Sequence, residues 1–103
     1  MKIENIQKLC TERKIRWSAH SLARLQERGL SRDDVISCIL SGEIIEDYPE
    51  DFPHPSCLVF GYADGSKAVH SVVGTDGEYF YIITAYIPNT DKFEKDLKTR
   101  KKG

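Results

Sequence analysis

Two Asp-Gly pairs, at 64–65 and 76–77, constrain the fold of this chain more than any other feature. An Asp-Gly pair between apolar runs is a strong signal for a β-hairpin. The runs beside the pairs, 57–63, 67–73 and 78–87, include many β-branched and aromatic residues, which favour strands. The second half of the chain is therefore predicted to form an antiparallel β-meander.

The meander is predicted to begin with an earlier strand and to be followed by a short helix. Residues 43–48 have an apolar centre typical of a strand. Pro49, Pro53 and Pro55 then prevent regular structure until the next strand. After the last strand, residues 91–98 are predicted to form a short helix.

The first part of the chain has the periodicity and the caps of three helices. Apolar residues recur at helical spacing over 3–13, and residues 14–16 form a short link or strand. Ser18 is a good N-cap for a second helix, which Gly29 ends as a left-handed residue. Ser31 caps a third helix, with two aspartates in its first turn.

These elements predict an α+β fold in which N-terminal helices pack on a small antiparallel β-meander. The length of 103 residues is enough for one domain, which we assign to residues 1–103. No apolar run approaches the length of a membrane-spanning helix, and the N-terminus lacks the apolar core of a signal peptide. We therefore expect a cytoplasmic protein.

The charge of the chain restricts how it can bind anions. A net charge of −1 gives no overall attraction to nucleic acid, so any anion site has to come from a local patch. The C-terminal tail is one candidate for such a patch, and a frayed, solvated terminus is the alternative. The basic residues of the tail are Lys95, Lys98, Arg100, Lys101 and Lys102.

The cysteines and histidines do not form a recognisable metal motif. The three cysteines are widely spaced, which argues against a disulfide framework, and Cys10 and Cys38 are predicted to be small core residues. His54 and Cys57 have the spacing of a ligand pair, and the other two histidines can join them only through the fold. No paired motif completes the set, so we predict neither a metal nor another cofactor.

The clearest candidate for chemistry is a stripe on the second helix, formed by His20, Arg24 and Arg28 at i, i+4 and i+8. Near the helix N-terminus a neutral imidazole can act as a base, and two guanidinium groups can clamp a phosphate. The alternative is a solvated surface in which Glu27 pairs with Arg24. The opposite side of this helix carries Ala19, Leu22, Ala23 and Gln26.

His70 is the second candidate, and its neighbours depend on the register of the last hairpin. A three-residue loop at 75–77 is favoured and places His70 opposite Ile82. A two-residue loop places it opposite Ile83 instead. The alternative to a catalytic role is a cross-strand histidine with satisfied hydrogen bonds.

Tyrosine and threonine hydroxyl groups lie near His70 in the predicted sheet. Thr84 and Tyr86 are two residues apart on a strand and therefore share one face, which is also the face of His70. Tyr79 and Tyr81 are predicted to pack on the other face.

The ordered motifs resemble a bacterial domain family of unknown function, whose members are small proteins distantly similar to RelE/BrnT-type toxins. This resemblance implies helices on a small antiparallel sheet, metal-free RNA cleavage and a partner antitoxin. It extends over about residues 15–100. The motifs that carry it are Ser18-Ala19-His20, Arg24, Glu27-Arg28-Gly29-Leu30-Ser31, Val35, Gly42 to Pro49, Val69-His70-Ser71-Val72-Val73 and Ile83-Thr84-Ala85-Tyr86-Ile87-Pro88.

Two hypotheses follow. The first is a toxin-like endoribonuclease that binds RNA and an antitoxin, in which a base takes a ribose 2′-OH proton and an acid protonates the leaving 5′-oxygen. The second is a non-catalytic protein-interaction module, which the near-zero net charge and the proline-rich segment favour. For the first, the predicted catalytic residues are His20, His70 and Tyr86, and the predicted substrate-binding residues are Arg24, Arg28, Thr84 and Arg100.

Overall fold

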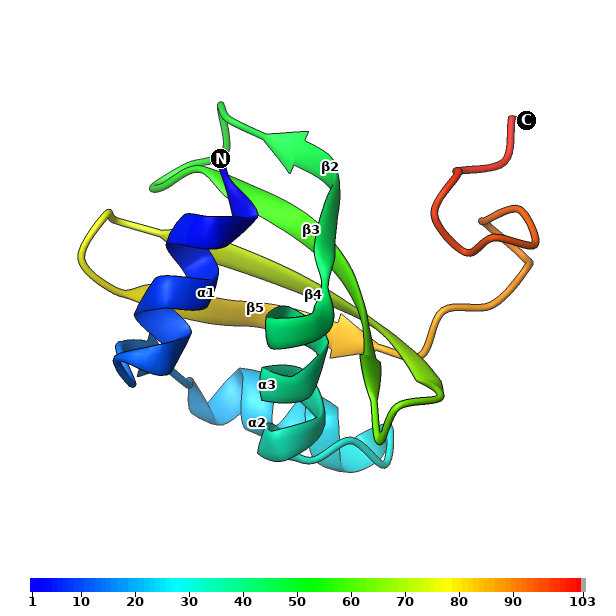
Figure 1. Cartoon of the computed structure of the whole chain (residues 1–103), viewed down its shortest axis with the longest axis horizontal. Helices are drawn as coiled ribbons and strands as arrows, with labels where there is room; N and C mark the ends of the chain where they lie inside the picture. Colours follow the sequence, from blue (N-terminus) through cyan, green and yellow to red (C-terminus); the bar gives the residue numbers. More distant parts are fainter. Residues whose placement is uncertain (103) are drawn as a thin grey trace.

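The computed structural model describes residues 1–102 and confirms the α+β class (Figure 1). Its sheet has the order β1-β5-β4-β3-β2. Strands β2 to β5 form the predicted antiparallel meander, while β1 pairs in parallel with β5 and makes the sheet mixed. The elements are α1 Ile3–Thr11, β1 Ile15–Arg16, α2 Ala19–Glu27, α3 Arg32–Ser41, β2 Glu43–Tyr48, β3 Ser56–Ala63, β4 Lys67–Thr75 and β5 Phe80–Tyr86.

The predicted helix caps are confirmed. The Ser18 side chain accepts a hydrogen bond of 3.0 Å from the Ser21 backbone N–H, and the Ser21 hydroxyl oxygen accepts one from the Ser18 backbone N–H. Ser31 and Asp34 form the same reciprocal pair at the start of α3. Gly29 ends α2 with a φ of +67°, the left-handed conformation that glycine adopts without steric cost.

The turn between β4 and β5 is longer than predicted. Thr75 pairs with Phe80, which leaves four residues, 76–79, in the turn instead of a three-residue loop. The Asp76 side chain holds this turn by accepting hydrogen bonds from the Glu78 and Tyr79 backbone N–H groups at 2.9 and 2.8 Å.

A β-bulge in the β4–β5 pairing changes the partner of His70. The longer turn alone would place His70 opposite Ala85. The register shift between Val72 and Val73 moves the partner by one more residue, so that His70 lies opposite Tyr86 and not opposite Ile82 or Ile83. Thr84, Tyr86 and His70 share a face, as predicted. Tyr81 pairs with Gly74 and therefore lies on that same face, so its predicted assignment to the other face is wrong.

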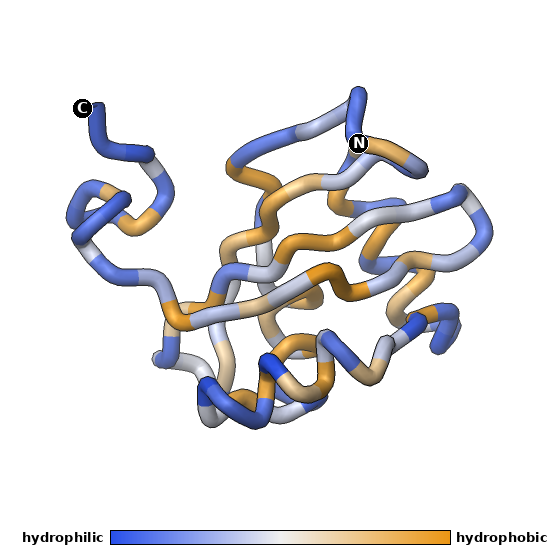
Figure 2. Tube along the Cα trace, turned by 180° about the vertical axis from the view of Figure 1, so that it is seen from behind, coloured by the Kyte–Doolittle hydropathy of each residue, from blue (hydrophilic) through white to orange (hydrophobic). Residues whose placement is uncertain are grey.

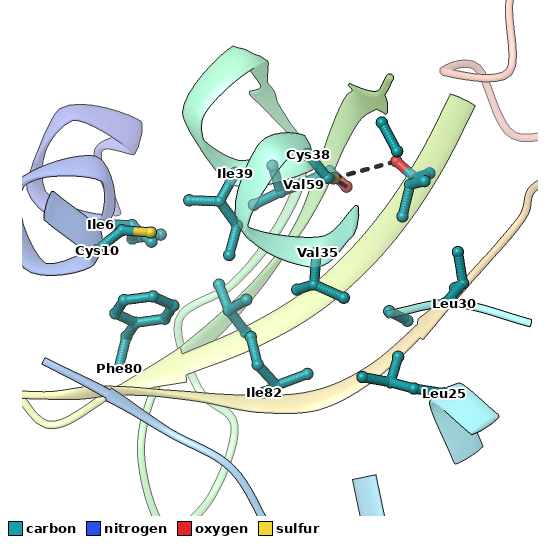
Figure 3. Close-up of a cluster of buried hydrophobic side chains, with 14 of the residues drawn as sticks. Ile6, Cys10, Leu25, Leu30, Val35, Cys38, Ile39, Val59, Phe80 and Ile82 are labelled. Carbon is teal, nitrogen blue, oxygen red and sulfur yellow. Dashed lines mark hydrogen bonds between the residues drawn. The ribbon is translucent and has the colours of Figure 1, made fainter. Parts of the chain in front are cut away.

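The helices cover one face of the sheet and enclose the core. Side chains of α3 and β5 point toward one another in Figure 3, with Val35 and Ile39 near Phe80 and Ile82. Cys10 and Cys38 are buried core residues, as predicted, and Cys57 is buried as well; all three are free thiols. Figure 2 shows the hydrophobic stretches of the trace gathered where helices and strands face one another.

The opposite face of the sheet is partly covered by residues 88–102, which we call the C-terminal strap. Residues 91–98 form turns and not the predicted helix, with one β-bridge between Phe93 and Arg100. The strap lies apart from the three helices in Figure 1. Phe93 is only 3% exposed, so the strap packs on the sheet and is not a frayed tail.

Residues 1–102 contain neither a candidate membrane span nor a cluster of potential metal ligands. No helix there has both the length and the apolar character that a membrane span requires. Within that same range, no three His, Cys, Asp or Glu side chains are grouped as a metal ion would need.

Candidate functional site

His70 and Tyr86 form a hydrogen-bonded pair on the strap side of the sheet. His70 Nδ1 lies 3.2 Å from the Tyr86 hydroxyl group, and Nε2 lies 2.7 Å from the Leu97 carbonyl oxygen. Because a carbonyl can only accept, Nε2 is assigned the proton, and Nδ1 then accepts from the Tyr86 O–H. The pair therefore consists of a neutral imidazole and a protonated phenol.

The surroundings of this pair stabilise those protonation states. His70 is 0% exposed and makes edge contacts with the rings of Phe60, Tyr86 and Phe93, the last at a centroid distance of 4.7 Å. Burial lowers the pKa of His70, although the hydrogen bond to Leu97 and the charge of Glu46 oppose this effect. Burial also raises the pKa of Tyr86.

An ion pair joins the strap to the edge strand beside His70. Arg100 Nε and Nη2 donate to the two carboxylate oxygens of Glu46, each at 3.0 Å. Tyr48 donates to the same carboxylate, and Lys98 lies 3.2 Å from Glu43. The Arg100 hydrogen bond is the largest cause of the lowered pKa of Glu46, while burial is the largest cause that raises the pKa of Tyr48 to about 12.

Two adjoining hollows open beside the pair. The first has a volume of about 380 Å³ and is lined by Tyr86, Lys92 and Arg100, by the carboxylate residue Asp91, and by strap residues that include Phe93. The second, of about 340 Å³, shares Lys92 and Arg100 and is extended by the lysines at 101 and 102. An anion in the first hollow can therefore meet a phenol hydroxyl group and two cationic side chains.

The stripe on α2 meets the sheet only at its C-terminal end. Arg28 Nη1 donates to Thr84 Oγ1 and to the Ala85 carbonyl, both at 2.8 Å. Arg24 forms an exposed ion pair with Glu27 at 3.4 Å, as the alternative interpretation expected. His20 is exposed, and it has no hydrogen bond or ion pair with any residue from 1 to 102.

Helix geometry explains why the stripe divides in this way. Ser21 and Leu25 are the buried residues of α2. Each step of four residues advances about 40° around a helix, so a stripe of three residues turns by roughly 80°. Arg28 is therefore close to the buried direction, whereas His20 points away from it. His20 and His70 are not brought into contact, and both ring nitrogens of His70 have other partners.

Four residues of the site were not anticipated from the sequence, namely Glu46, Lys92, Phe93 and Leu97. The alternation of Glu46 and Tyr48 on a predicted strand was a usable signal, because residues two apart share a face. Nothing local indicates that Phe93 and Leu97 cover His70. A further hollow of about 490 Å³ between α1 and the β4–β5 turn contains none of the predicted site residues.

A family assignment follows from comparison with known proteins. The family model described as "Domain of unknown function (DUF4258)" matches residues 17–87, and the chain belongs to this family. No curated protein and no solved structure matches the chain. The matched region runs from α2 to the end of β5 and includes both His70 and Tyr86. It leaves out α1, β1 and the C-terminal strap.

Proposed function

We propose that this chain is a toxin-like protein of a toxin–antitoxin pair, and that it cleaves RNA without a metal ion. The observation that carries the proposal is the 3.2 Å contact of His70 with Tyr86 beside a hollow lined by Lys92 and Arg100. The resemblance of the sequence motifs to small proteins distantly similar to RelE/BrnT-type toxins suggests the reaction class and the antitoxin partner, by analogy.

In the proposed reaction, a ribose 2′-oxygen attacks the adjacent phosphorus and the bond from phosphorus to the 5′-oxygen breaks. Once Nε2 is released from the Leu97 carbonyl, neutral His70 in its Nδ1–H tautomer takes the 2′-hydroxyl proton at Nε2. Tyr86 gives its proton to the leaving 5′-oxygen and regains one from His70 along their hydrogen bond. Lys92 and Arg100 offset the negative charge of the transition state. The products are a 2′,3′-cyclic phosphate and a 5′-hydroxyl group.

The proposal gives positioning roles to Arg28 and Thr84. Arg28 bonds the side chain of Thr84 and the carbonyl of Ala85, and these two residues immediately precede Tyr86 in β5. Holding this segment fixes the Tyr86 ring relative to His70. A catalytic role for His20, and substrate contacts by Arg24 and by Arg28 itself, remain predictions from the sequence, and RNA cleavage by alanine variants at these positions tests them.

The function is tested with a variant that lacks only the phenol oxygen of Tyr86. Purified protein is incubated with single-stranded RNA and excess chelator, and cleavage products are analysed for cyclic phosphate ends. Tyr86→Phe keeps the ring and removes the proton donor, so cleavage should fall about 100-fold or more, as expected for the loss of a general acid. Tyr62→Phe makes the same change at a half-exposed position on β3 and should cleave normally. Equal rates for wild type and Tyr86→Phe contradict the proposal.

Two observations favour a second candidate, a non-catalytic interaction module. His70 is fully buried with both ring nitrogens satisfied, which is also what a purely structural histidine shows. In addition, Phe52 is 95% exposed in the proline-rich loop between β2 and β3. An aromatic side chain held in solvent is typical of a contact for a protein partner.

A further inference from the structure

We infer that the C-terminal strap is a built-in cover that closes the His70–Tyr86 site and has to move before His70 can act. This inference rests on the proposed function, because it concerns access to that same site. The strap is not part of the family match, which ends at residue 87, directly before the first strap residue.

The first argument is that strap residues contact the His70 imidazole, which has to be free to take a proton from the substrate. His70 Nε2 donates to the carbonyl of Leu97, a strap residue, at 2.7 Å. The Phe93 ring stands almost perpendicular to the imidazole, at 87° and a centroid distance of 4.7 Å. With the strap in place, no part of His70 is exposed to solvent. A substrate can therefore reach Tyr86 through the hollow but cannot reach His70.

The second argument is that the attachments of the strap suit reversible opening. Its far end is held by the Arg100–Glu46 and Lys98–Glu43 ion pairs, whose side chains are between 20% and 56% exposed. Exposed ion pairs are weak and are screened by salt. Residues 91–98 form turns and bends with no helix, so only a few contacts oppose a change of path. Phe93 is the main apolar anchor.

The third argument concerns what would open the cover. The strap contributes cationic side chains to the two hollows, namely Lys92, Arg100, Lys101 and Lys102. A polyanion bound there competes with Glu46 for Arg100, because phosphate and carboxylate groups use the same guanidinium donors. Binding of a phosphate-rich ligand and opening of the site are thus coupled through one residue.

The experiment measures access to His70 directly. Diethyl pyrocarbonate acylates a free imidazole nitrogen, and trypsin places the three histidines of the full-length chain on separate peptides for mass spectrometry. In the wild type, His70 should react at least about tenfold more slowly than His20, because labelling of a covered group follows the population of its open form. Phe93→Ala should raise the His70 rate severalfold. Phe52→Ala makes the same change at an exposed loop and should leave the labelling rate of His70 unaltered.

Glu46→Gln provides a second opening variant that leaves the strap sequence intact. It weakens the hold on Arg100, while the amide oxygen can still accept the hydrogen bond of Tyr48. The half-buried His54, which packs beside Tyr81, reports on the rest of the fold and should keep its rate in every variant. Wild-type His70 that reacts as fast as His20 overturns the inference. So does a His70 rate that neither Phe93→Ala nor Glu46→Gln increases.

RNA cleavage by the same samples separates the two proposals. Faster labelling of His70 in Phe93→Ala together with faster cleavage supports both. Faster labelling without any cleavage supports the cover and contradicts the nuclease function. Cleavage by the wild type with His70 freely labelled supports the nuclease and contradicts the cover.

Discussion

At the scale of single residues, His70 has the most unusual position in the molecule. It is an ionisable side chain with no exposed surface, and each ring nitrogen has one hydrogen-bond partner. Protonation at Nδ1 would replace the acceptor that Tyr86 uses and would place a charge among Phe60 and Phe93. The fold therefore favours the neutral imidazole, and stability has to depend on pH through this residue.

The sign of that dependence follows from the lowered pKa of His70. Between its folded value and the ordinary value of 6.5, the unfolded chain binds the proton more readily, so stability is present above about 6.5 and is lost as the pH falls. The free energy of unfolding from urea titrations should thus decrease between pH 7.5 and pH 5.5. His70→Gln should show a smaller decrease in the free energy of unfolding. His20→Gln, at an exposed position, should show the same decrease as the wild type. An equal decrease in all three proteins would contradict this role for His70.

At the scale of elements, the close approach of α3 to β3 defines the helical side of the sheet. Gly61 lies where the helix backbone passes over the strand, and a Cβ atom there would come within 1.9 Å of the Cys38 carbonyl oxygen. A Cβ atom on Gly42 would likewise lie only 2.4 Å from that oxygen. The strand can accept the helix at this distance only because these positions have no side chain.

Gly61→Ala should therefore destabilise the protein by more than about 2 kcal/mol, because backbone has to move to relieve the overlap. Gly74→Ala is a matched control in β4, where the nearest atoms belong to the outer end of the half-exposed Tyr81 ring. That ring can shift, so the loss should be clearly smaller. Chemical denaturation measures the free energy of unfolding of both variants. Equal losses of stability would contradict the special closeness of the α3–β3 contact.

At the scale of the whole molecule, the two faces of the sheet have different roles. One face supports three helices and an apolar core, and the other carries His70, Tyr86 and the strap. The residues shared with the family, 17–87, contain most of the core and the pair, but neither α1 nor the strap. A surface for a protein partner, if the second candidate function holds, lies elsewhere, at the loop that carries Phe52.

That second candidate makes its own prediction. A partner bound through the exposed loop should lose affinity with Phe52→Ala, because an aromatic anchor at an interface contributes about 2 kcal/mol or more. Ile87→Ala, at another exposed apolar position, should bind normally. A pull-down recovers the partner, and titration then measures its affinity for each variant. Failure to recover a stable partner, or an affinity that Phe52→Ala does not change, argues against this second candidate.

The sequence by itself determined the parts of this protein that depend on neighbouring residues. Ser18, Ser31 and Gly29 act within one helical turn, and Thr84 and Tyr86 share a face through the two-residue repeat of a strand. Only the tertiary structure decided what depends on distant pairing. The longer turn and one bulge placed His70 opposite Tyr86, and Phe93, Leu97 and Arg100 closed the site from the far end of the chain. Such contacts have no local signature, because their energy exists only once the sheet has formed.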